Sequence, residues 1–248
     1  MPLVRPLWTA LLDLVAERDC GGCGRPQPSG HPLCGPCGRL LAVGGPWRVL
    51  AAVPEVPPTH AVARYEDPVR SMLIAYKERG RHDLRRALGE ALARAVAATV
   101  DSGALRGTRS PASAQRPLTG PLTLVPMPSR RRAVRDRGED TTARMARSAA
   151  RALREAGVPA RTIPALCHAR AVADQAGLTR DQRRANLSGA LRARRSAAGA
   201  GPSAVVLVDD IATSGASLAE AARALRAAGV PVLGAATVAA ARVQAQSA

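Results

Sequence analysis

The stretch VVLVDDIATSGAS, residues 205–217, runs from four apolar residues into two adjacent carboxylates and then into an uncharged loop of small residues. The apolar run 205–208 is rich in β-branched residues and does not alternate with polar ones, which predicts a short strand buried on both faces. The next segment, LAEAARALRAAG, carries apolar residues at helical spacing and ends at Gly229, a common helix stop. The stretch therefore predicts a strand, loop and helix of an open α/β sheet, in which ligands lie at the carboxyl ends of the strands.

Asp209 and Asp210 stand where the predicted strand ends. Adjacent carboxylates repel unless hydroxyl groups or cations lie against them, and a ribose diol with a divalent cation meets that need. The following residues offer hydroxyls and backbone N–H groups at a helix N-terminus, which favours a phosphate: Ala212, Thr213, Ser214, Gly215, Ala216 and Ser217. The diol site at the carboxylates and the phosphate site at the loop together predict a ribose 5-phosphate as the ligand. The alternative is a solvated turn in which Ser214 caps the helix, and both can hold because a cap and a phosphate cradle share one geometry.

The whole stretch resembles the signature of the phosphoribosyltransferases: an apolar strand, two acidic residues and a loop of the form T-[TS]-G-x-[ST]. Here Ser214 stands where that family often has threonine. The resemblance implies 5-phosphoribosyl-1-pyrophosphate as ligand, with the ribose and Mg²⁺ at Asp209 and Asp210 and the 5-phosphate at 212–217. It also implies a parallel sheet flanked by helices.

The composition fits a soluble α/β protein with an anionic partner. A chain of 248 residues can hold one such domain with an appendage, or two small domains. The formal net charge of +17 favours nucleic acid or phosphorylated ligands. With no Phe and only two Trp and two Tyr, the chain is poor in the aromatic rings on which single-stranded DNA usually stacks.

Lysine occurs once, at position 77, in a chain that otherwise uses arginine. An exposed lysine tolerates replacement by arginine, whereas a lysine that acts as a compact point charge does not. We therefore interpret Lys77 as a functional residue. The alternative is that this one lysine survived by chance.

Two C-x-x-C pairs lie close together near the N-terminus, in CGGCGRPQPSGHPLCGPCG. Cys20, Cys23, Cys34 and Cys37 can close a tetrahedral shell around Zn²⁺, which predicts a structural zinc ribbon at 19–45. Disulfides and a thioredoxin-like redox role fit less well in a cytoplasmic chain without a βαβ context. His31 could replace one thiolate but reads as a solvated loop residue, and Cys167 reads as a buried apolar residue.

The rest of the chain divides into a helix, a linker and one large domain. Residues 1–18 predict an amphipathic helix, too polar for an export signal and too short for a membrane span, so we expect a cytoplasmic protein. A proline-rich linker at 46–60 precedes a phosphoribosyltransferase-type domain at 61–243, which contains a flexible insertion at about 101–120. The domain opens with an edge strand at 61–67 and two helical stretches around Gly80.

The segment PLTLVPMPSRRR predicts a strand at 122–125 followed by a turn rich in cations. In phosphoribosyltransferases the corresponding loop holds pyrophosphate, and arginine can bind phosphate through two hydrogen bonds. The resemblance assigns that loop to Pro126, Met127, Pro128, Ser129 and Arg130. The alternative is a solvated basic turn. A helix at 141–156 and a strand within 158–163 follow.

A second resemblance covers most of the chain. The segment RAVADQAGLTRDQRRANLSGAL, with the cysteine pairs, YKERG and the acidic pair, resembles the ComF family, which joins a zinc ribbon to a phosphoribosyltransferase-type domain. The family's positions in and before this segment fall on Lys77, Arg170, Gln175, Leu178, Arg183 and Asn186. The family usually has R-G-F-N-Q where this chain has RGEDT, 137–141, so a ligand contact through that aromatic or amide is in doubt, although Asp140 can cap the next helix.

Two functions follow from these resemblances. The first is transfer of ribose 5-phosphate to a nitrogenous acceptor, in which Lys77 or Arg183 neutralises the leaving pyrophosphate. No general base stands out, and His168 is the nearest histidine in sequence to the 170–191 segment. The second is a non-catalytic role in natural competence, in which the protein handles incoming single-stranded DNA and the ligand site is regulatory or vestigial. Because aromatic residues are scarce, DNA binding would rest on phosphate contacts and fall steeply with salt.

Overall fold

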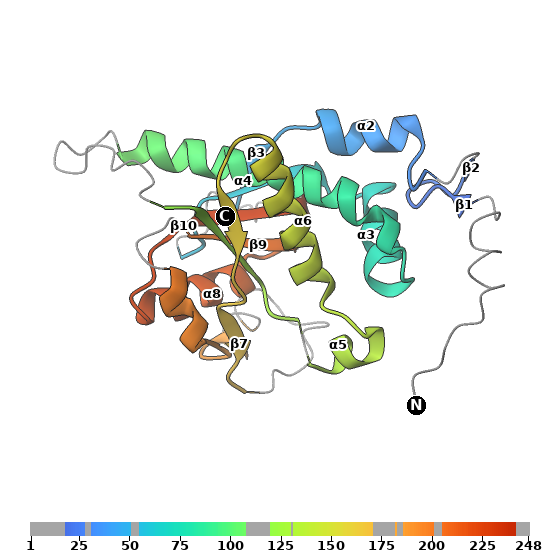
Figure 1. Ribbon diagram of the computed structural model, residues 1–248. Coiled ribbons are helices and arrows are strands. Elements are labelled where there is room, and N and C mark those ends of the chain that lie inside the picture. Colours follow the sequence, from blue (N-terminus) through green and yellow to red (C-terminus); the bar gives the residue numbers. More distant parts are fainter. Residues whose placement is uncertain are drawn as a thin grey trace, which may run out of the picture.

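A mostly parallel sheet of six strands, in the order β3-β4-β10-β9-β5-β6, forms the centre of the molecule (Figure 1). The computed structural model describes residues 18–27, 31–50, 55–107, 120–129, 131–170, 182, 186–200 and 205–241. Only β3 runs antiparallel to its neighbour within this sheet. The strands are Trp47–Val49 (β3), Thr59–Arg64 (β4), Leu122–Pro126 (β5), Ala160–Thr162 (β6), Val205–Ala212 (β9) and Val232–Ala240 (β10). The α/β class expected from the sequence is confirmed.

Strand β9 is buried on both faces, as its unbroken apolar run predicts. Val206 and Val208 belong to the core on one face of the sheet, whereas Val205 and Leu207 belong to the core on the other. A central strand of a parallel sheet must be apolar on both faces because helices cover both. The strand does not stop at Val208, as the sequence predicts, but continues to Ala212, so the acidic pair lies inside it.

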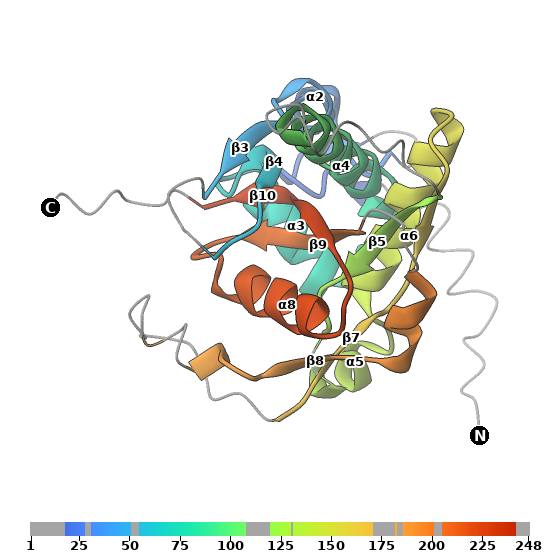
Figure 2. The same cartoon turned by 90° about the vertical axis from the view of Figure 1, so that its left-hand side faces the viewer.

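Helices cover the two faces of the sheet unequally (Figure 2). One face packs against α2, α3, α4 and α6, and the other packs against α8. Figure 2 places α2 and α4 on one side of the sheet and α8 on the opposite side. The helices span Gly35–Val43 (α2), Val69–Glu78 (α3), Arg85–Gly107 (α4), Thr141–Glu155 (α6) and Ala216–Ala227 (α8).

Shorter elements complete the described part of the chain. A small antiparallel pair near the N-terminus and another beyond α8 stand apart from the central sheet. These elements are Arg18–Asp19 (β1), Pro26–Gln27 (β2), Leu166–His168 (β7) and Leu191–Ala193 (β8), with helix Arg131–Arg137 (α5) and the 3₁₀ turns His82–Leu84 (η2) and Arg195–Ala200 (η3).

The structure corrects the predicted edge strand at 61–67. Strand β4 lies between β3 and β10, because Trp47–Val49, within the predicted linker, pairs with it antiparallel. Residues on β4 are therefore shielded on both sides, and five of its six residues are buried.

The predicted helices of the domain are confirmed as α3, α4, α6 and α8. Helix α4 continues to Gly107, into the predicted insertion at 101–120, and residues 108–119 lie outside the described residues. The predicted N-terminal helix also falls almost wholly outside them, since 1–17 are not described. Among the described helices, none combines the length and the apolar character needed to cross a membrane.

Candidate functional site

The acidic pair lies where β9 loses one of its two neighbours. Strand β5 ends at Pro126, which is aligned with Val208, whereas β10 still pairs with β9 at Asp209 and beyond. The backbone of Asp209 and Asp210 is therefore held by the sheet on one side and open to a loop on the other. This is the position at which parallel sheets bind ligands.

The two carboxylates of the acidic pair lie close enough to interact with each other. Asp210 is buried, and Asp209 interacts with both the Asp210 side chain and the charge of Lys77. The backbone N–H of Asp210 donates to Asp209 Oδ1 at 2.9 Å. The two carboxylates thus form one acidic site at the end of β9.

Lys77, in the last turn of α3, meets the Asp210 side chain. Its Nζ lies 2.9 Å from Asp210 Oδ2, with side-chain exposures of 29% for the lysine and 6% for the aspartate. Burial disfavours the ammonium, but the carboxylates of Asp210 and Asp209 outweigh it and raise the pKa of Lys77. Burial, followed by the charge of Asp210, raises the pKa of Asp209 well above its usual range. The ammonium of Lys77 therefore balances the charge of the Asp210 carboxylate.

The loop after β9 has the form of an anion cradle. Gly215 adopts a φ of 78°, and a Cβ there would lie 2.6 Å from Val56 Cγ2, so only glycine fits. Within the described part of the chain, the backbone N–H groups of Thr213, Ser214 and Gly215 donate no hydrogen bond, and they precede the N-terminus of α8. Ser214 Oγ accepts the N–H of Ala216 at 3.4 Å, although the N-cap itself is Gly215.

The predicted pyrophosphate loop begins beside the acidic pair. Met127 N donates to Val208 O at 2.9 Å, and Pro128 O lies 3.1 Å from His168 Nε2 on β7. Ser129 Oγ donates to Asp140 Oδ1 at 2.8 Å. Arg130 lies outside the described residues. A cavity of about 370 Å³ opens next to this loop, lined by Pro126, Met127, Pro128, Ser129, Val134, Arg135, Asp140, Pro164, Leu166 and Arg194.

The 170–191 segment is described only in part. Arg170 Nη2 donates to the carbonyls of Asn186 and Ser188 at 2.8 and 2.9 Å. The two family positions Arg170 and Asn186 are thus brought together. Gln175, Leu178 and Arg183 fall outside the described residues.

Glu139 and Asp140, which depart from the family pattern, both have structural partners. Asp140 caps α6 by accepting Ala143 N at 3.0 Å, as predicted. Glu139 is largely buried, with Oε1 3.0 Å from His82 Nδ1 and Oε2 2.6 Å from Arg144 Nε. This segment therefore fastens α6 to η2.

Sequence reasoning gave no positioning role to two residues that contact the site's elements, His168 and Arg137. Arg137 Nη1 lies 3.4 Å from both Lys77 O and Thr141 Oγ1, so it ties α3 to α6. Arg137 matches the family pattern, which could have marked it as functional. Its contacts with Lys77 and Thr141 could not be predicted from the spacing of residues in the sequence. Nothing near His168 in the sequence indicated its contact with Pro128.

The four cysteines converge as predicted. Their sulfurs all lie within 4.8 Å of one another, and Cys34 N donates to Cys20 Sγ at 3.3 Å. Burial and the neighbouring sulfurs raise the pKa of Cys37, and burial opposes a thiolate at Cys20 too, but backbone N–H groups hold its pKa at about 6. Four crowded sulfurs of this kind fit Zn²⁺, whose charge would let all of them ionise.

The prediction that Cys167, outside this cluster, is a buried residue is wrong. The residue is only partly buried, on β7, and its Sγ lies 3.8 Å from Arg192 O. Strand β7 belongs to a two-stranded sheet that contributes Leu166 and Leu191 to the core, whereas the neighbouring Cys167 is only partly enclosed.

Comparison with protein families matches residues 145–247 to the phosphoribosyl transferase domain. The matched span begins within α6, includes the acidic pair, the 213–217 loop and β10, and leaves out Lys77 and β5. A search of curated proteins finds no match. The chain thus combines a phosphoribosyltransferase-type domain with a four-cysteine cluster placed to bind a metal.

Proposed function

We propose that this protein binds 5-phosphoribosyl-1-pyrophosphate, or a closely related sugar phosphate, together with Mg²⁺. The ribose diol lies against Asp209 and Asp210, the 5-phosphate against 212–217 and the pyrophosphate against 126–130. One observation carries the proposal: the acidic pair is followed directly by a loop whose N–H groups, at Thr213, Ser214 and Gly215, have no acceptor in the described chain. Such groups at a helix N-terminus stabilise a phosphate.

Mg²⁺ suits the oxygen donors of this site. It prefers carboxylate oxygens and substrate phosphates, and it usually binds through one or two carboxylates. When bound, Mg²⁺ would neutralise charge on the pyrophosphate. The residues at hand for it are Asp209 and Asp210, at the end of the sheet where β5 stops.

The test is calorimetric titration of the zinc-loaded protein with 5-phosphoribosyl-1-pyrophosphate and Mg²⁺. We expect binding that is lost in the Asp209→Asn, Asp210→Asn double variant. The matched control is Glu90→Gln, Glu155→Gln, which removes two exposed carboxylates from the cleft between α4 and α6. Absence of binding heat and of a thermal shift in the wild-type protein would overturn the proposal.

The wider proposal is a ComF-type protein associated with natural competence. It rests on the combination of the cysteine cluster, Lys77 and the phosphoribosyltransferase-type domain in one chain. Catalysis would transfer ribose 5-phosphate to a nitrogenous acceptor, with Lys77 or Arg183 stabilising the leaving pyrophosphate. An acceptor screen that follows pyrophosphate release tests turnover separately from binding.

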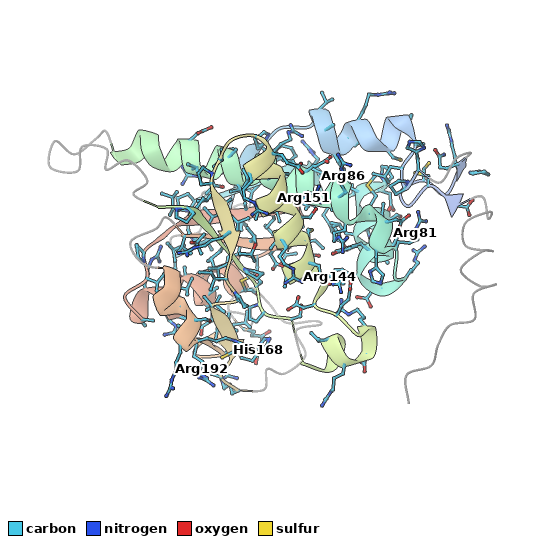
Figure 3. All side chains as sticks on the ribbon, viewed as in Figure 1. Arg81, Arg86, Arg144, Arg151, His168 and Arg192 are labelled. Carbon is cyan, nitrogen blue, oxygen red and sulfur yellow. The ribbon has the colours of Figure 1, made fainter. Side chains whose placement is uncertain are left out.

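A second candidate function, binding of single-stranded DNA, is favoured by a cleft of about 470 Å³ between α4 and α6. Figure 3 shows Arg86, Arg144 and Arg151 on this side of the molecule, away from Arg192 at the opposite end. The arginines of α6 recur three and four residues apart, or about 4.5–6 Å along the axis, and share one face. The cleft is lined by Arg85, Arg86, Glu90, Arg144, Arg147, Ser148, Arg151, Ala152 and Glu155.

Fluorescence anisotropy with a labelled oligo-dT strand tests this second function. Arg86→Gln, Arg147→Gln, Arg151→Gln should weaken binding and lower the slope of log K against log salt by about 2, since each phosphate contact on a single strand contributes about 0.7. The control is Arg192→Gln, Arg194→Gln, Arg195→Gln, which removes the same charge near β8. Equal weakening by both triple variants would contradict a site in the cleft.

A further inference from the structure

The one lysine of the chain neutralises one carboxylate of the acidic pair. Lys77 and Asp210 are 133 positions apart in sequence, and their 2.9 Å ion pair joins α3 to β9. Only 6% of the Asp210 side chain is exposed, and the ammonium of Lys77 lies against its Oδ2. A ligand or cation that binds this Asp210 oxygen must therefore displace the ammonium of Lys77.

The backbone of Lys77 is anchored on the pyrophosphate side of the site. Lys77 O accepts from Arg137 Nη1, which also contacts Thr141 Oγ1. The preceding residue, Tyr76, is buried, and its hydroxyl donates to Thr141 O at 2.9 Å. Thr141 directly follows Asp140, whose carboxylate holds Ser129. The last turn of α3 is thus fixed to the segment that supports the 126–130 loop, while its ammonium reaches the acidic pair.

This arrangement gives the ammonium two alternative anionic partners. A divalent cation on Asp210 would lie against the ammonium at ion-pair distance, where two positive charges disfavour each other. A pyrophosphate on the 126–130 loop would offer new oxygens to a lysine whose backbone already lies on that side. Lysine suits such an exchange because its charge is compact and its stem is flexible.

We propose that Lys77 is a charge switch: it holds Asp210 in the unliganded protein, excludes free divalent cations from the acidic pair, and moves to a phosphate oxygen when the sugar phosphate and its cation arrive together. The inference rests on the proposed sugar-phosphate site. It adds a mechanism by which a divalent cation is excluded from that site until the sugar phosphate binds. The protein would accept the ligand and the cation as a complex rather than the cation first.

The first arm of the test measures Mn²⁺ binding to the zinc-loaded protein by electron paramagnetic resonance, without any sugar phosphate. Lys77→Met should bind Mn²⁺ roughly tenfold more tightly than wild type, because the repelling charge at Asp210 is gone. Lys77→Arg keeps the charge and should bind as weakly as wild type. The control Arg79→Gln removes an exposed charge two residues away from Lys77. A second control, Lys77→Met combined with Asp210→Asn, should lose the Mn²⁺ site that Lys77→Met alone exposes at Asp210. Equal affinity of Lys77→Met and Arg79→Gln would overturn the proposal.

The second arm uses the unmutated chain and so does not depend on the folding of a variant. Reductive methylation with ¹³C-formaldehyde labels only Lys77 and the N-terminal amine, because the chain has no other lysine, and Lys77→Arg identifies the Lys77 signal. Mg²⁺ alone should leave that signal in place, and 5-phosphoribosyl-1-pyrophosphate with Mg²⁺ should move it. Movement by millimolar Mg²⁺ alone would overturn the switch. Calorimetric absence of ligand binding in wild type would instead overturn the sugar-phosphate site, so the two failures are distinguishable.

Discussion

The hydroxyl of Ser129 and the backbone N–H of Ala143 share one acceptor, Asp140 Oδ1, at 2.8 and 3.0 Å. A single carboxylate oxygen thus caps α6 and fixes the loop that follows β5. This contact gives a physical role to the acidic residue found where the family pattern has an amide. The loop is held by its neighbours in the fold before any ligand arrives.

Replacing Asp140 by Ala should lower the free energy of unfolding by about 1 kcal/mol, the usual value of an N-cap side chain. The same change frees Ser129, so we also expect weaker binding of 5-phosphoribosyl-1-pyrophosphate. Urea unfolding and calorimetry measure the two effects. Asp140→Asn keeps an acceptor and caps helices equally well, so it should retain stability and most of the affinity. Equal destabilisation by Ala and Asn would show that charge, not the cap, is responsible.

The local parts of the site could be predicted because their signals are local. An unbroken apolar run rich in β-branched residues predicted β9, helical spacing predicted α8, and the spacing of four cysteines predicted the metal cluster. In each case a few adjacent residues determine the structure. The same reasoning anticipated Asp140 as the cap of α6, since its hydrogen bond spans three residues.

The parts that sequence could not supply depend on residues far apart in the chain. The partner of Lys77 was not readable, because the ion pair with Asp210 requires α3 to lie over the end of β9. The true end of β9 depends on β10, which pairs with it as far as Ala212 after β5 has stopped. The buried position of Glu139 likewise depends on His82.

Helix α4 passes close to α6 at Gly89, whereas Gly38 on α2 has open space around it. Substitution by alanine should therefore change the free energy of unfolding in opposite directions at these two positions. A Cβ on Gly89 would lie 2.5 Å from Ser148 Cβ and 3.1 Å from Ala149 N, so Gly89→Ala should destabilise the protein by about 1–3 kcal/mol through overpacking. Gly38, inside α2, has no atom within 4 Å of a built Cβ. Gly38→Ala should therefore stabilise by about 0.5–1 kcal/mol through helix propensity. Thermal or urea unfolding of both variants checks the pair, and stabilisation by Gly89→Ala would contradict the close contact.

His60 on β4 should make the protein less stable in mild acid. Burial, followed by the charge of Arg48 across the strand pair, lowers the pKa of His60, and its Nδ1 lies 3.1 Å from Thr99 Oγ1. The unfolded chain, with a histidine pKa of about 6.5, then takes up the proton before the folded chain does. Stability is therefore full above about pH 6.5 and falls as the pH decreases toward the folded pKa, by at most about 1.4 kcal/mol per pH unit.

Urea unfolding of wild type and His60→Gln across pH 5–7.5 measures this contribution. Gln can still hydrogen bond to Thr99 but does not titrate, so the slope below about pH 6.5 should flatten. His31→Gln, at an exposed histidine, should keep the wild-type slope. Identical slopes in all three proteins would place the acid sensitivity on other groups.

The four-cysteine cluster packs directly on the elements that present Lys77, so metal removal should reach the ligand site. Cys20 and Cys37 belong to the same core cluster as Met72 of α3 and Leu84 of η2, and Arg81 Nη1 donates to Asp19 O at 2.9 Å. A strong chelator should therefore release zinc, lower the melting temperature and weaken binding of 5-phosphoribosyl-1-pyrophosphate, because α3 loses its support.

Metal analysis, thermal unfolding and calorimetry before and after chelation follow these three effects. Cys37→Ser should reproduce them without chelator, whereas Cys167→Ser, on β7 away from the cluster, should retain zinc and affinity. Zinc readdition should restore binding in the chelated wild-type protein, since folding and metal binding of such sites are coupled. Full ligand affinity in zinc-free protein would show that the cluster supports only the N-terminal segment, and that the rest of the fold positions α3 without it.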